Sequence, residues 1–382
     1  MHRTTSHTLL RGVAPALAAV VLATGCAGAS KATKEDVVFP PPPQKGRIRW
    51  VQSFKTEDDF KPSAWRSFAK AVVPHDSSTS MFAPSSVALS PDEKTLYVGL
   101  PHRQRVAVVD LTSGAFRAIG LSAKNPLKRP IGVATDAQGN VYVTDKDVNA
   151  VYVFAPDGGL VRTFDPGVLR APTGIAVDRR RQVAYVVSDG SLQEGRHTVE
   201  VFSLAGKHLR TIGGGRSGEP GFFNFPRSVY VSPSGELYVG DMLNFRVQVF
   251  DPDGQVVRTF GQAGSGFPGV FDKIHSVAQD TFGNIYVADA MQGIHILNPK
   301  AQPLMLFGTG VTGAPTGIAI DSRNRIYVAD LLHAVHIFEL INTTAADSYP
   351  GETAPKSPAP SGTPATTTAP TAVPAPATTP KP

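Results

Sequence analysis

The stretch from Phe225 to Phe250, FPRSVYVSPSGELYVGDMLNFRVQVF, carries the clearest structural pattern in this chain. It contains three short runs rich in β-branched and aromatic residues, at Ser228–Val231, Glu236–Val239 and Arg246–Phe250. Such side chains suit the half-buried surface of a sheet, and turn residues separate the runs. The stretch therefore predicts three consecutive strands.

The same pattern occurs six times along the chain. Its landmark is a Tyr-Val pair in the second strand, and successive pairs lie between 41 residues (Tyr286 to Tyr327) and 53 residues (Tyr185 to Tyr238) apart. In several copies a Pro-Asp-Gly turn introduces a fourth strand, as at Leu160–Phe164. Repeats of this length with four strands are typical of the blades of a β-propeller.

These repeats resemble the NHL-repeat family, whose blades carry P-x-G-[IV]-A-[VI]-D, then G-x-[IL]-Y-V-A-D, then R-V-x-V-F. The resemblance covers about residues 80–340 and implies an all-β fold, a six-bladed NHL-type β-propeller. The sixth copy ends at Phe338 without an outer strand, whereas Gly46–Phe54 (GRIRWVQSF) has the texture of one. We expect this N-terminal strand to complete blade six, because closing the ring removes exposed sheet edges.

The start of the chain has the composition of an export signal. Residues 1–25 combine a basic beginning with an apolar run, and Leu22-Ala-Thr-Gly-Cys26 resembles a bacterial lipobox. We expect a lipid anchor on Cys26; the alternative is a free thiol that is discarded with the signal. By analogy with bacterial lipoproteins, Ala27 implies sorting to the outer membrane, with the periplasmic and the surface leaflet both open.

The remaining segments follow from composition. Residues 26–45 predict a Pro-rich tether, 46–340 the propeller, and 341–382 a disordered Pro/Ala/Thr-rich tail that lacks the apolar residues for a core. A short helix is expected within Asp58–Val73, packed on the propeller or in contact with lipid or a partner. The modest excess of 37 Lys and Arg over 31 Asp and Glu indicates attraction to anionic surfaces, and we expect no nucleic-acid partner for an exported chain.

The repeats also argue against a catalytic centre. Eight aspartates recur in register after the first and second strands, where Asp stabilises turns, so we predict no catalytic residue among them. They are Asp136, Asp178, Asp280, Asp321, Asp145, Asp241, Asp289 and Asp330. Three G-x-G-x-x-G matches lack the following helix that a dinucleotide site needs. We therefore predict no cofactor apart from the lipid.

Departures from the repeat gather at one end of the expected channel. There the loops that lead into the inner strands emerge beside the loops between second and third strands; we call this end the entry face. Its loops are unusually apolar, and exposed apolar patches mark binding sites. The predicted face for an envelope or extracellular protein partner comprises Phe222, Phe223, Arg227, Met242, Leu243, Phe267, His275, Met291, Leu331 and Leu332.

A metal-dependent lyase or lactonase is the alternative. The peptidylglycine amidating lyase, a propeller of similar repeats, binds zinc through histidines at the position of His275, so His275, His333 and His102 are weak metal candidates. A protein zinc site needs three ligands, and only one repeat places a histidine there. We favour a non-enzymatic binding or scaffolding module in the cell envelope. Its resemblance to lipoproteins that accompany exported multihaem cytochromes implies an accessory role in electron transfer.

Overall fold

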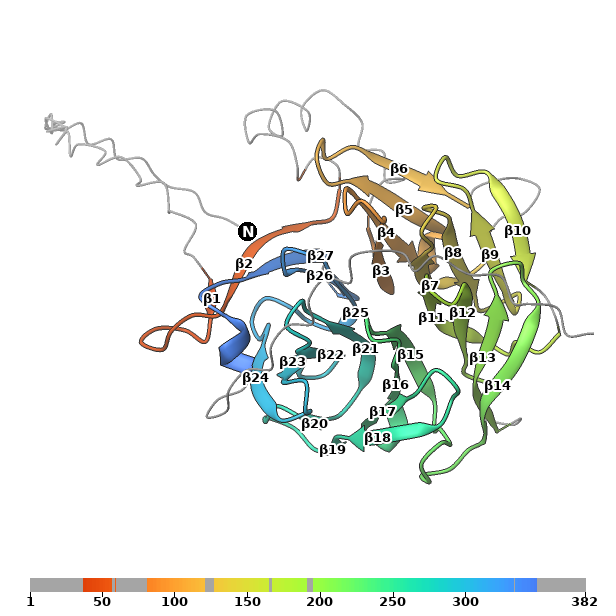
Figure 1. Ribbon diagram of the computed structural model, residues 1–382. Helices are drawn as coiled ribbons and strands as arrows, with labels where there is room; N and C mark the ends of the chain where they lie inside the picture. The colour runs from red at the N-terminus through yellow and green to blue at the C-terminus, as the bar shows by residue number, and fades with distance from the viewer. Residues whose placement is uncertain are drawn as a thin grey trace, which may run out of the picture. The chain divides into compact units, whose positions relative to one another are not determined.

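The computed structural model describes residues 37–56, 59, 81–120, 127–164, 167–190, 195–332 and 334–348. Six sheets of four or five strands surround a central channel, so the predicted all-β, six-bladed propeller is confirmed (Figure 1). The predicted lipid site Cys26, most of Asp58–Val73, His333 and the chain after Ser348 lie outside the described residues. None of the described helices is long and apolar enough to cross a membrane.

Each of the first five blades is an antiparallel sheet whose four strands follow one another in the sequence. Blade one contains β3 (Ser86–Leu89), β4 (Thr95–Leu100), β5 (Arg105–Asp110) and β6 (Phe116–Ile119). Blade two contains β7 (Pro130–Thr135), β8 (Val141–Asp145), β9 (Ala150–Phe154) and β10 (Leu160–Phe164). Blade three contains β11 (Pro172–Asp178), β12 (Val183–Ser188), β13 (Arg196–Ser203) and β14 (His208–Gly215).

Blade four is the stretch that carries the clearest pattern. It contains β15 (Pro226–Val231), β16 (Leu237–Asp241), β17 (Arg246–Phe250) and β18 (Val256–Phe260). The short strands β19 (Gln262–Ala263) and β20 (Val270–Phe271) pair in parallel in the loop that leads to blade five. Blade five contains β21 (Ile274–Gln279), β22 (Ile285–Asp289), β23 (Gly293–Leu297) and β24 (Pro303–Phe307).

Blade six joins the two ends of the propeller. It contains β25 (Pro315–Ile320), β26 (Arg325–Asp330) and β27 (Val335–Leu340), followed by the N-terminal β2 (Ile48–Phe54). The pairing of β2 with β27 is antiparallel, from Ile48 opposite Leu340 to Phe54 opposite Val335, which confirms the predicted closure.

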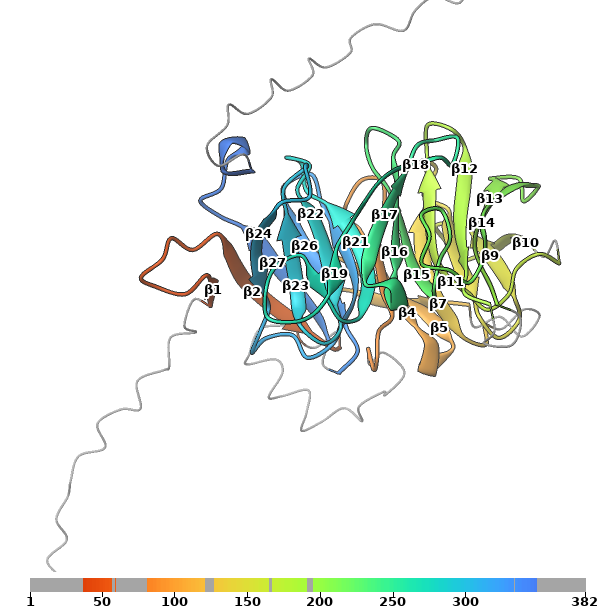
Figure 2. The same cartoon turned by 90° about the horizontal axis from the view of Figure 1, so that it is seen from below.

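Blade six includes residues that lie before and after the predicted propeller segment 46–340 in the sequence. A fifth strand, β1 (Val38–Phe39), pairs with β2 inside the segment 26–45 that was assigned to the tether. Beyond the end of β27, the amide of Ile341 donates to the carbonyl of Arg47 over 2.7 Å and so continues the pairing with β2. The 3₁₀ helix η5 (Ala345–Ser348) follows and lies on the side of the blade opposite the entry face (Figure 2). Residues on both sides of the predicted propeller segment 46–340 therefore bond to blade six.

Neighbouring blades pack face to face through the repeated apolar residues. Tyr142, Val151 and Val153 of blade two, for example, share one buried cluster with Ile175 and Ala184 of blade three. Each buried aliphatic or aromatic side chain contributes about 1.5–3 kcal/mol relative to exposure. This packing explains the Tyr-Val landmark, because the tyrosine of every second strand is buried between two blades.

Glycine in the inner strands lets adjacent blades approach closely around the channel. A Cβ atom on Gly174 would lie 2.8 Å from the carbonyl oxygen of Arg227 in the next blade. At the seam between blades six and one, a Cβ on Gly317 would lie 2.7 Å from the Cα atom of Ser86. Real Cβ atoms do not come so close to backbone, so the repeat requires glycine here.

Candidate functional site

The exposed apolar side chains of the loops all lie on the entry face. Among the described residues they are Phe82, Val148, Phe222, Leu243, Phe267, Met291, Leu331 and Leu332. The other exposed large apolar side chains belong to outer strands of blades, at Val51, Leu160, Val161, Leu209 and Val257. In the described part of the chain, none occupies a hairpin at the opposite end of the channel, which we call the hairpin face. The asymmetry makes the entry face the candidate binding surface.

Not every residue predicted for this surface is available to a partner. Phe267, Met291 and Leu332 are the most exposed, at 71%, 65% and 66%. The prediction that Phe223 belongs to the partner-binding surface is wrong, because its side chain is fully buried. The centroid of its ring lies 5.7 Å from that of Phe250. Phe223 packs in the cluster between blades three and four, while its neighbour Phe222 is exposed.

Other predicted members are less exposed than expected. Met242 is half-buried in the short 3₁₀ helix η4 (Met242–Asn244), beside the exposed Leu243. Arg227 and His275 line the mouth of the channel and are half-buried. The candidate site therefore has two parts, an apolar set of loop tips and a polar channel mouth.

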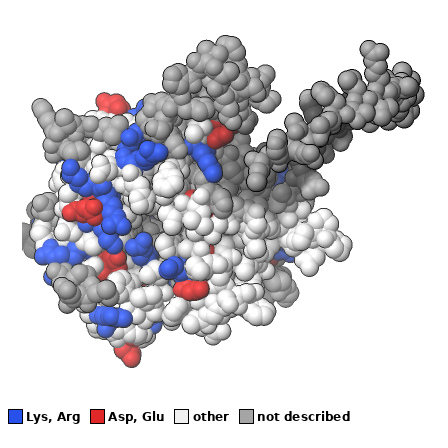
Figure 3. Space-filling view, turned by 180° about the vertical axis from the view of Figure 1, so that it is seen from behind, with Lys and Arg blue, Asp and Glu red and all other residues white. Residues whose placement is uncertain are grey.

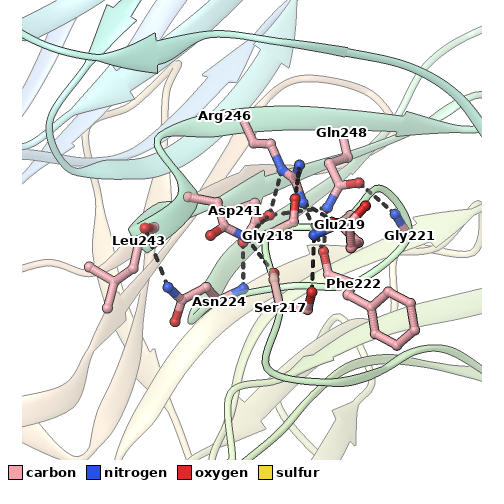
Figure 4. Close-up of polar contacts among 11 residues, drawn as sticks. Ser217, Gly218, Glu219, Gly221, Phe222, Asn224, Asp241, Leu243, Arg246 and Gln248 are labelled. Atoms are coloured by element: carbon pink, nitrogen blue, oxygen red, sulfur yellow. Dashed lines mark hydrogen bonds and ion pairs between the residues drawn. The ribbon is translucent and has the colours of Figure 1, made fainter.

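A partly buried polar network holds the loop that carries Phe222 (Figure 4). Arg246 donates to Asp241 over 2.9 Å and to the carbonyl oxygens of Gly218, Glu219 and Phe222 over 2.7, 2.9 and 3.1 Å. Gln248, fully buried in β17, donates to the carbonyl of Phe222 over 2.7 Å. Because these backbone oxygens are satisfied internally, the loop is organised before any partner arrives.

Equivalent aspartates fix the other entry loops. The carboxylate of Asp289 accepts hydrogen bonds from the amides of Asp272, Lys273 and Met291. Asp330 binds the amides of Gly313, Ala314 and Leu332 in the same way. The structural role predicted for the repeated aspartates therefore agrees with their hydrogen bonds.

Local contacts set the pKa values of these carboxyl groups. Burial raises the pKa of Asp241 and outweighs the hydrogen bonds from Asn224, Asn244 and Arg246 that favour its charged form. Burial would also raise the pKa of Asp330, but hydrogen bonds from His336 and the loop amides lower it to about 2. Both carboxylates accept the hydrogen bonds that hold the entry loops, so neither is free to act on a ligand.

The channel is a cavity of about 610 Å³ lined by the inner strands of all six blades. Its mouth on the entry face carries one equivalent position from each blade: Ser85, Ile131, Thr173, Arg227, His275 and Thr316. The guanidinium of Arg227 lies 3.6 Å from the carboxylate of Asp189, which also binds the ammonium of Lys146 over 3.0 Å. The mouth is therefore polar and carries positive charge.

The surroundings of His275 do not suit a metal cation. Burial, followed by the charges of Arg227 and Lys273, lowers the pKa of His275 to about 4, so its imidazole is neutral at pH 7. The same two cations would repel a metal ion. His102 packs against Phe82, with ring centroids 6.1 Å apart. Within the described residues no three His, Cys, Asp or Glu side chains gather as metal ligands, and His333 is not among them.

Charge divides the entry face into two halves (Figure 3). Lys and Arg gather on the loops of blades one to three, which we call the basic half, and the loops of blades four to six form a mostly uncharged apolar half. The basic half comprises Arg103, Arg105, Lys128, Arg129, Lys146, Arg170 and Arg196. The apolar half comprises Phe222, Leu243, Phe267, Met291, Leu331 and Leu332. A partner that covers the face would meet both chemistries.

The fold and the repeats define a six-bladed β-propeller. The NHL repeat family matches residues 223–250, the stretch that includes all of blade four up to β17. A chain of the nidogen–laminin complex is 17% identical, covers 66% of this chain and 88% of its own length, and has a TM-score of 0.53. The chain is thus a six-bladed β-propeller with a match to the NHL repeat in blade four.

Two enzymes share the same architecture. A gluconolactonase from Xanthomonas campestris is 16% identical, with 68% of this chain and 86% of that chain covered and a TM-score of 0.53. Virginiamycin B lyase from Staphylococcus aureus is 13% identical, with 70% and 83% covered and a TM-score of 0.50. At such identities the similarity concerns the fold alone, so function must be argued from the site.

Proposed function

We propose that this propeller is a non-enzymatic binding module of the cell envelope that docks a protein partner on its entry face. The observation that carries the proposal is that, among the described residues, exposed apolar side chains of loops lie on that face alone. Soluble surfaces rarely gather such side chains unless they bind something. In this proposal a lipid on Cys26 anchors the chain to the outer membrane, with the propeller held off the bilayer.

The apolar half has the features of an interface centre. Met291 and Phe267 belong to blade five and Leu332 to the adjacent blade six, so the three most exposed side chains come from neighbouring loops. Burying one such side chain contributes about 1.5–3 kcal/mol. The loops are already held by Asp241, Asp289 and Asp330, so little ordering entropy opposes binding.

The basic half adds selectivity. Exposed cations beside an apolar centre accelerate the approach of a partner that carries acidic residues, and they disfavour a basic one. The proposed partner is therefore an envelope protein with an apolar surface bordered by Asp and Glu. An exported multihaem cytochrome assembly is the specific partner class that the sequence resemblance suggests, and identification of the bound protein tests it.

Charge insertion into the apolar half tests the docking surface. We expect Leu332→Asp to abolish a complex that is otherwise recovered from solubilised envelopes by size-exclusion chromatography, because a carboxylate would be desolvated in the interface. Leu209→Asp is the matched control, since Leu209 is also exposed but lies on the outer strand β14. Equal loss in both variants, or in neither, would contradict the proposal.

The lipid anchor has its own test. Cys26→Ser removes the only thiol of the chain, so we expect the protein to lose metabolic labelling by palmitate and to leave the membrane fraction. If the Cys26→Ser protein carried no label but remained in the membrane fraction, the proposal of a lipid anchor would be overturned. The proposal of a docking surface would be unaffected.

A metal-dependent enzyme is the second candidate, favoured by one observation. His275 presents a neutral imidazole to a cavity of ligand size, and neutral imidazole is a metal ligand. Arg227 and Lys273 beside it oppose this function. Metal analysis of the full chain decides between the two: one equivalent of zinc that is lost in His275→Ala would replace the binding-module proposal by the enzyme.

A further inference from the structure

A buried polar residue occupies the same repeat position in the third strands of blades four and five. It is Gln248 in β17 and His295 in β23, and both side chains are fully buried. In each blade it stands opposite the second-strand residue that lies two positions before the aspartate holding the entry loop, Asp241 or Asp289. Gln248 and His295 therefore lie at equivalent places beneath their entry loops.

In blade four, the side chain of Gln248 connects the entry loop with the aspartate. Its Oε1 accepts the amide of Gly221 over 2.9 Å, and its Nε2 donates to the carboxylate of Asp241 over 3.1 Å. A side-chain amide carries fixed donors and acceptors and does not titrate. The Gln248 side chain therefore makes the same contacts at neutral and at acidic pH.

In blade five, His295 makes the corresponding contacts with an imidazole. Its Nδ1 accepts the amide of Gly269 over 3.2 Å, so the proton of the neutral ring lies on Nε2, which faces the carboxylate of Asp289 at 3.9 Å. Gly269 lies within a turn in which the carbonyl of Phe267 accepts the amide of Val270 over 3.3 Å. His295 thus holds the turn that carries Phe267, which at 71% is the most exposed side chain of the apolar half.

Gln292, which does not titrate, holds the same loop on either side of this contact. Its Nε2 donates to the carbonyl oxygens of Gly264 and Val270 over 3.0 and 3.1 Å. Its Oε1 accepts the amide of Gly266 over 2.8 Å. Because these bonds do not depend on His295, a change of its protonation acts on the turn and leaves the base of the loop in place.

Few charged groups surround the imidazole of His295. Asp289 in β22 faces Nε2, and the loop residues Asp272 and Lys273 reach Asp289 through their backbone amides. The ring of Phe271 in the loop lies 5.0 Å away between centroids, and the residue opposite in β24 is a leucine. Burial therefore dominates and lowers the pKa of His295 to about 4, although Asp289 acts in the opposite direction.

A protonated imidazole has a donor at both nitrogens, so a proton on Nδ1 excludes the hydrogen bond with the N–H of Gly269. We propose that His295 is a pH-sensitive switch of the docking surface: when its Nδ1 takes up a proton, the turn that carries Phe267 opens and the partner is released. The switch regulates the apolar half, so this inference rests on the proposed function.

The pH range of the switch follows from its closed and open states. Above about pH 6.5 the ring is neutral in both states. Between about pH 6.5 and 4 the exposed ring of the open state is protonated and the buried ring of the closed state is not. The open fraction should therefore rise about tenfold for each unit by which the pH falls. Below about pH 4 both states bind the proton, and the rise ends.

Hydrogen–deuterium exchange of the full chain, purified in detergent, measures the turn without a partner. At about pH 4.5 the turn should exchange up to about a hundredfold faster in the wild-type chain than in His295→Gln, and at pH 7 equally fast. Because the two proteins are compared at one pH, the pH dependence of the intrinsic exchange rate cancels. Gln248 fills the same position in blade four, so we expect His295→Gln to fold, and equal melting temperatures at pH 7 check this.

The reciprocal variant Gln248→His moves the titratable group to blade four. We expect its Phe222 loop to exchange faster at about pH 4.5 than that of the wild-type chain, for the same reason. Strand β22 should keep its protection in all three proteins, because the opening is local. Equal exchange of the turn in the wild-type chain and His295→Gln at about pH 4.5, no response in Gln248→His, or a loss of protection that extends to β22 would each overturn the switch.

The complex recovered from solubilised envelopes tests the regulatory role. We expect the wild-type chain to release its partner as the pH falls from about 6.5 to 4.5, and His295→Gln to retain it. If both proteins release the partner equally, the docking surface stands and the switch is overturned. If no complex forms at pH 7, the regulatory role fails together with the docking proposal, while the exchange measurement still shows whether the turn responds to pH.

Discussion

Replacing Arg246 by Met removes the centre of the network that holds the Phe222 loop. The Arg246 side chain is 13% exposed, and it forms an ion pair of 2.9 Å with the fully buried Asp241 besides three bonds to loop carbonyls. Breaking a buried ion pair by truncating one partner costs about 3–5 kcal/mol. Asp241 keeps the donors of Asn224, Asn244 and Gln248, so we place the loss at the low end, about 3 kcal/mol.

The assay is equilibrium unfolding in urea, with the free energy of unfolding compared between the wild-type chain and Arg246→Met. Arg323→Met is the control, because its exposed guanidinium lies 3.9 Å from Asp321 and such a pair contributes less than about 1 kcal/mol. The loop should also become sensitive to limited proteolysis, and partner binding should weaken although Arg246 is not part of the apolar half. A change in stability no larger than that of Arg323→Met, with an intact loop, would refute this account of the loop.

Three further predictions concern the ring and its charges. Gly317→Ala should destabilise the protein by about 1–3 kcal/mol in urea unfolding, since the new Cβ would meet the backbone of Ser86, whereas Gly215→Ala has open space and should change little. Deletion of residues 47–54 removes β2 and should lower the melting temperature sharply; an unchanged melting curve would exclude closure by this strand. Burial lowers the pKa of His295 from 6.5 to about 4, so the unfolded chain takes up the proton first. The free energy of unfolding should therefore fall by roughly 1.4 kcal/mol per pH unit as the pH falls from about 6.5 to 4. The fall should be shallower in His295→Gln, and equal slopes in the two proteins would contradict this prediction.

The repeats predicted the blades because each strand is specified by its own alternation and by its match to five other copies. The closing strand could be found for the same reason, since the sixth copy lacked an outer strand that Gly46–Phe54 could supply. The short β1 was missed because Val38–Phe39 is two residues long and precedes a run of prolines. Its pairing depends on β2, which the local sequence does not show.

The site was harder to predict than the fold. Phe222 and Phe223 are the same residue type in the same loop, and only the tertiary structure decides that Phe223 turns toward Phe250. The network around Arg246 was also missed. A usable indication exists in β17, where Gln248 is a polar residue at a position flanked by Val247 and Val249 and is fully buried. A buried polar side chain needs a partner, and here the partner is the entry loop.

Site-specific photo-cross-linking in living cells tests the central claim most directly. A photoreactive amino acid replaces Met291 in the apolar half or, as the matched control, Leu209 on the outer strand β14; both side chains are exposed. The docking account predicts one defined cross-linked protein from position 291 and none from position 209, with the product lost when Leu332→Asp is added. Cross-links of equal yield from both positions, or from position 209 alone, would show that the entry face is not the docking surface.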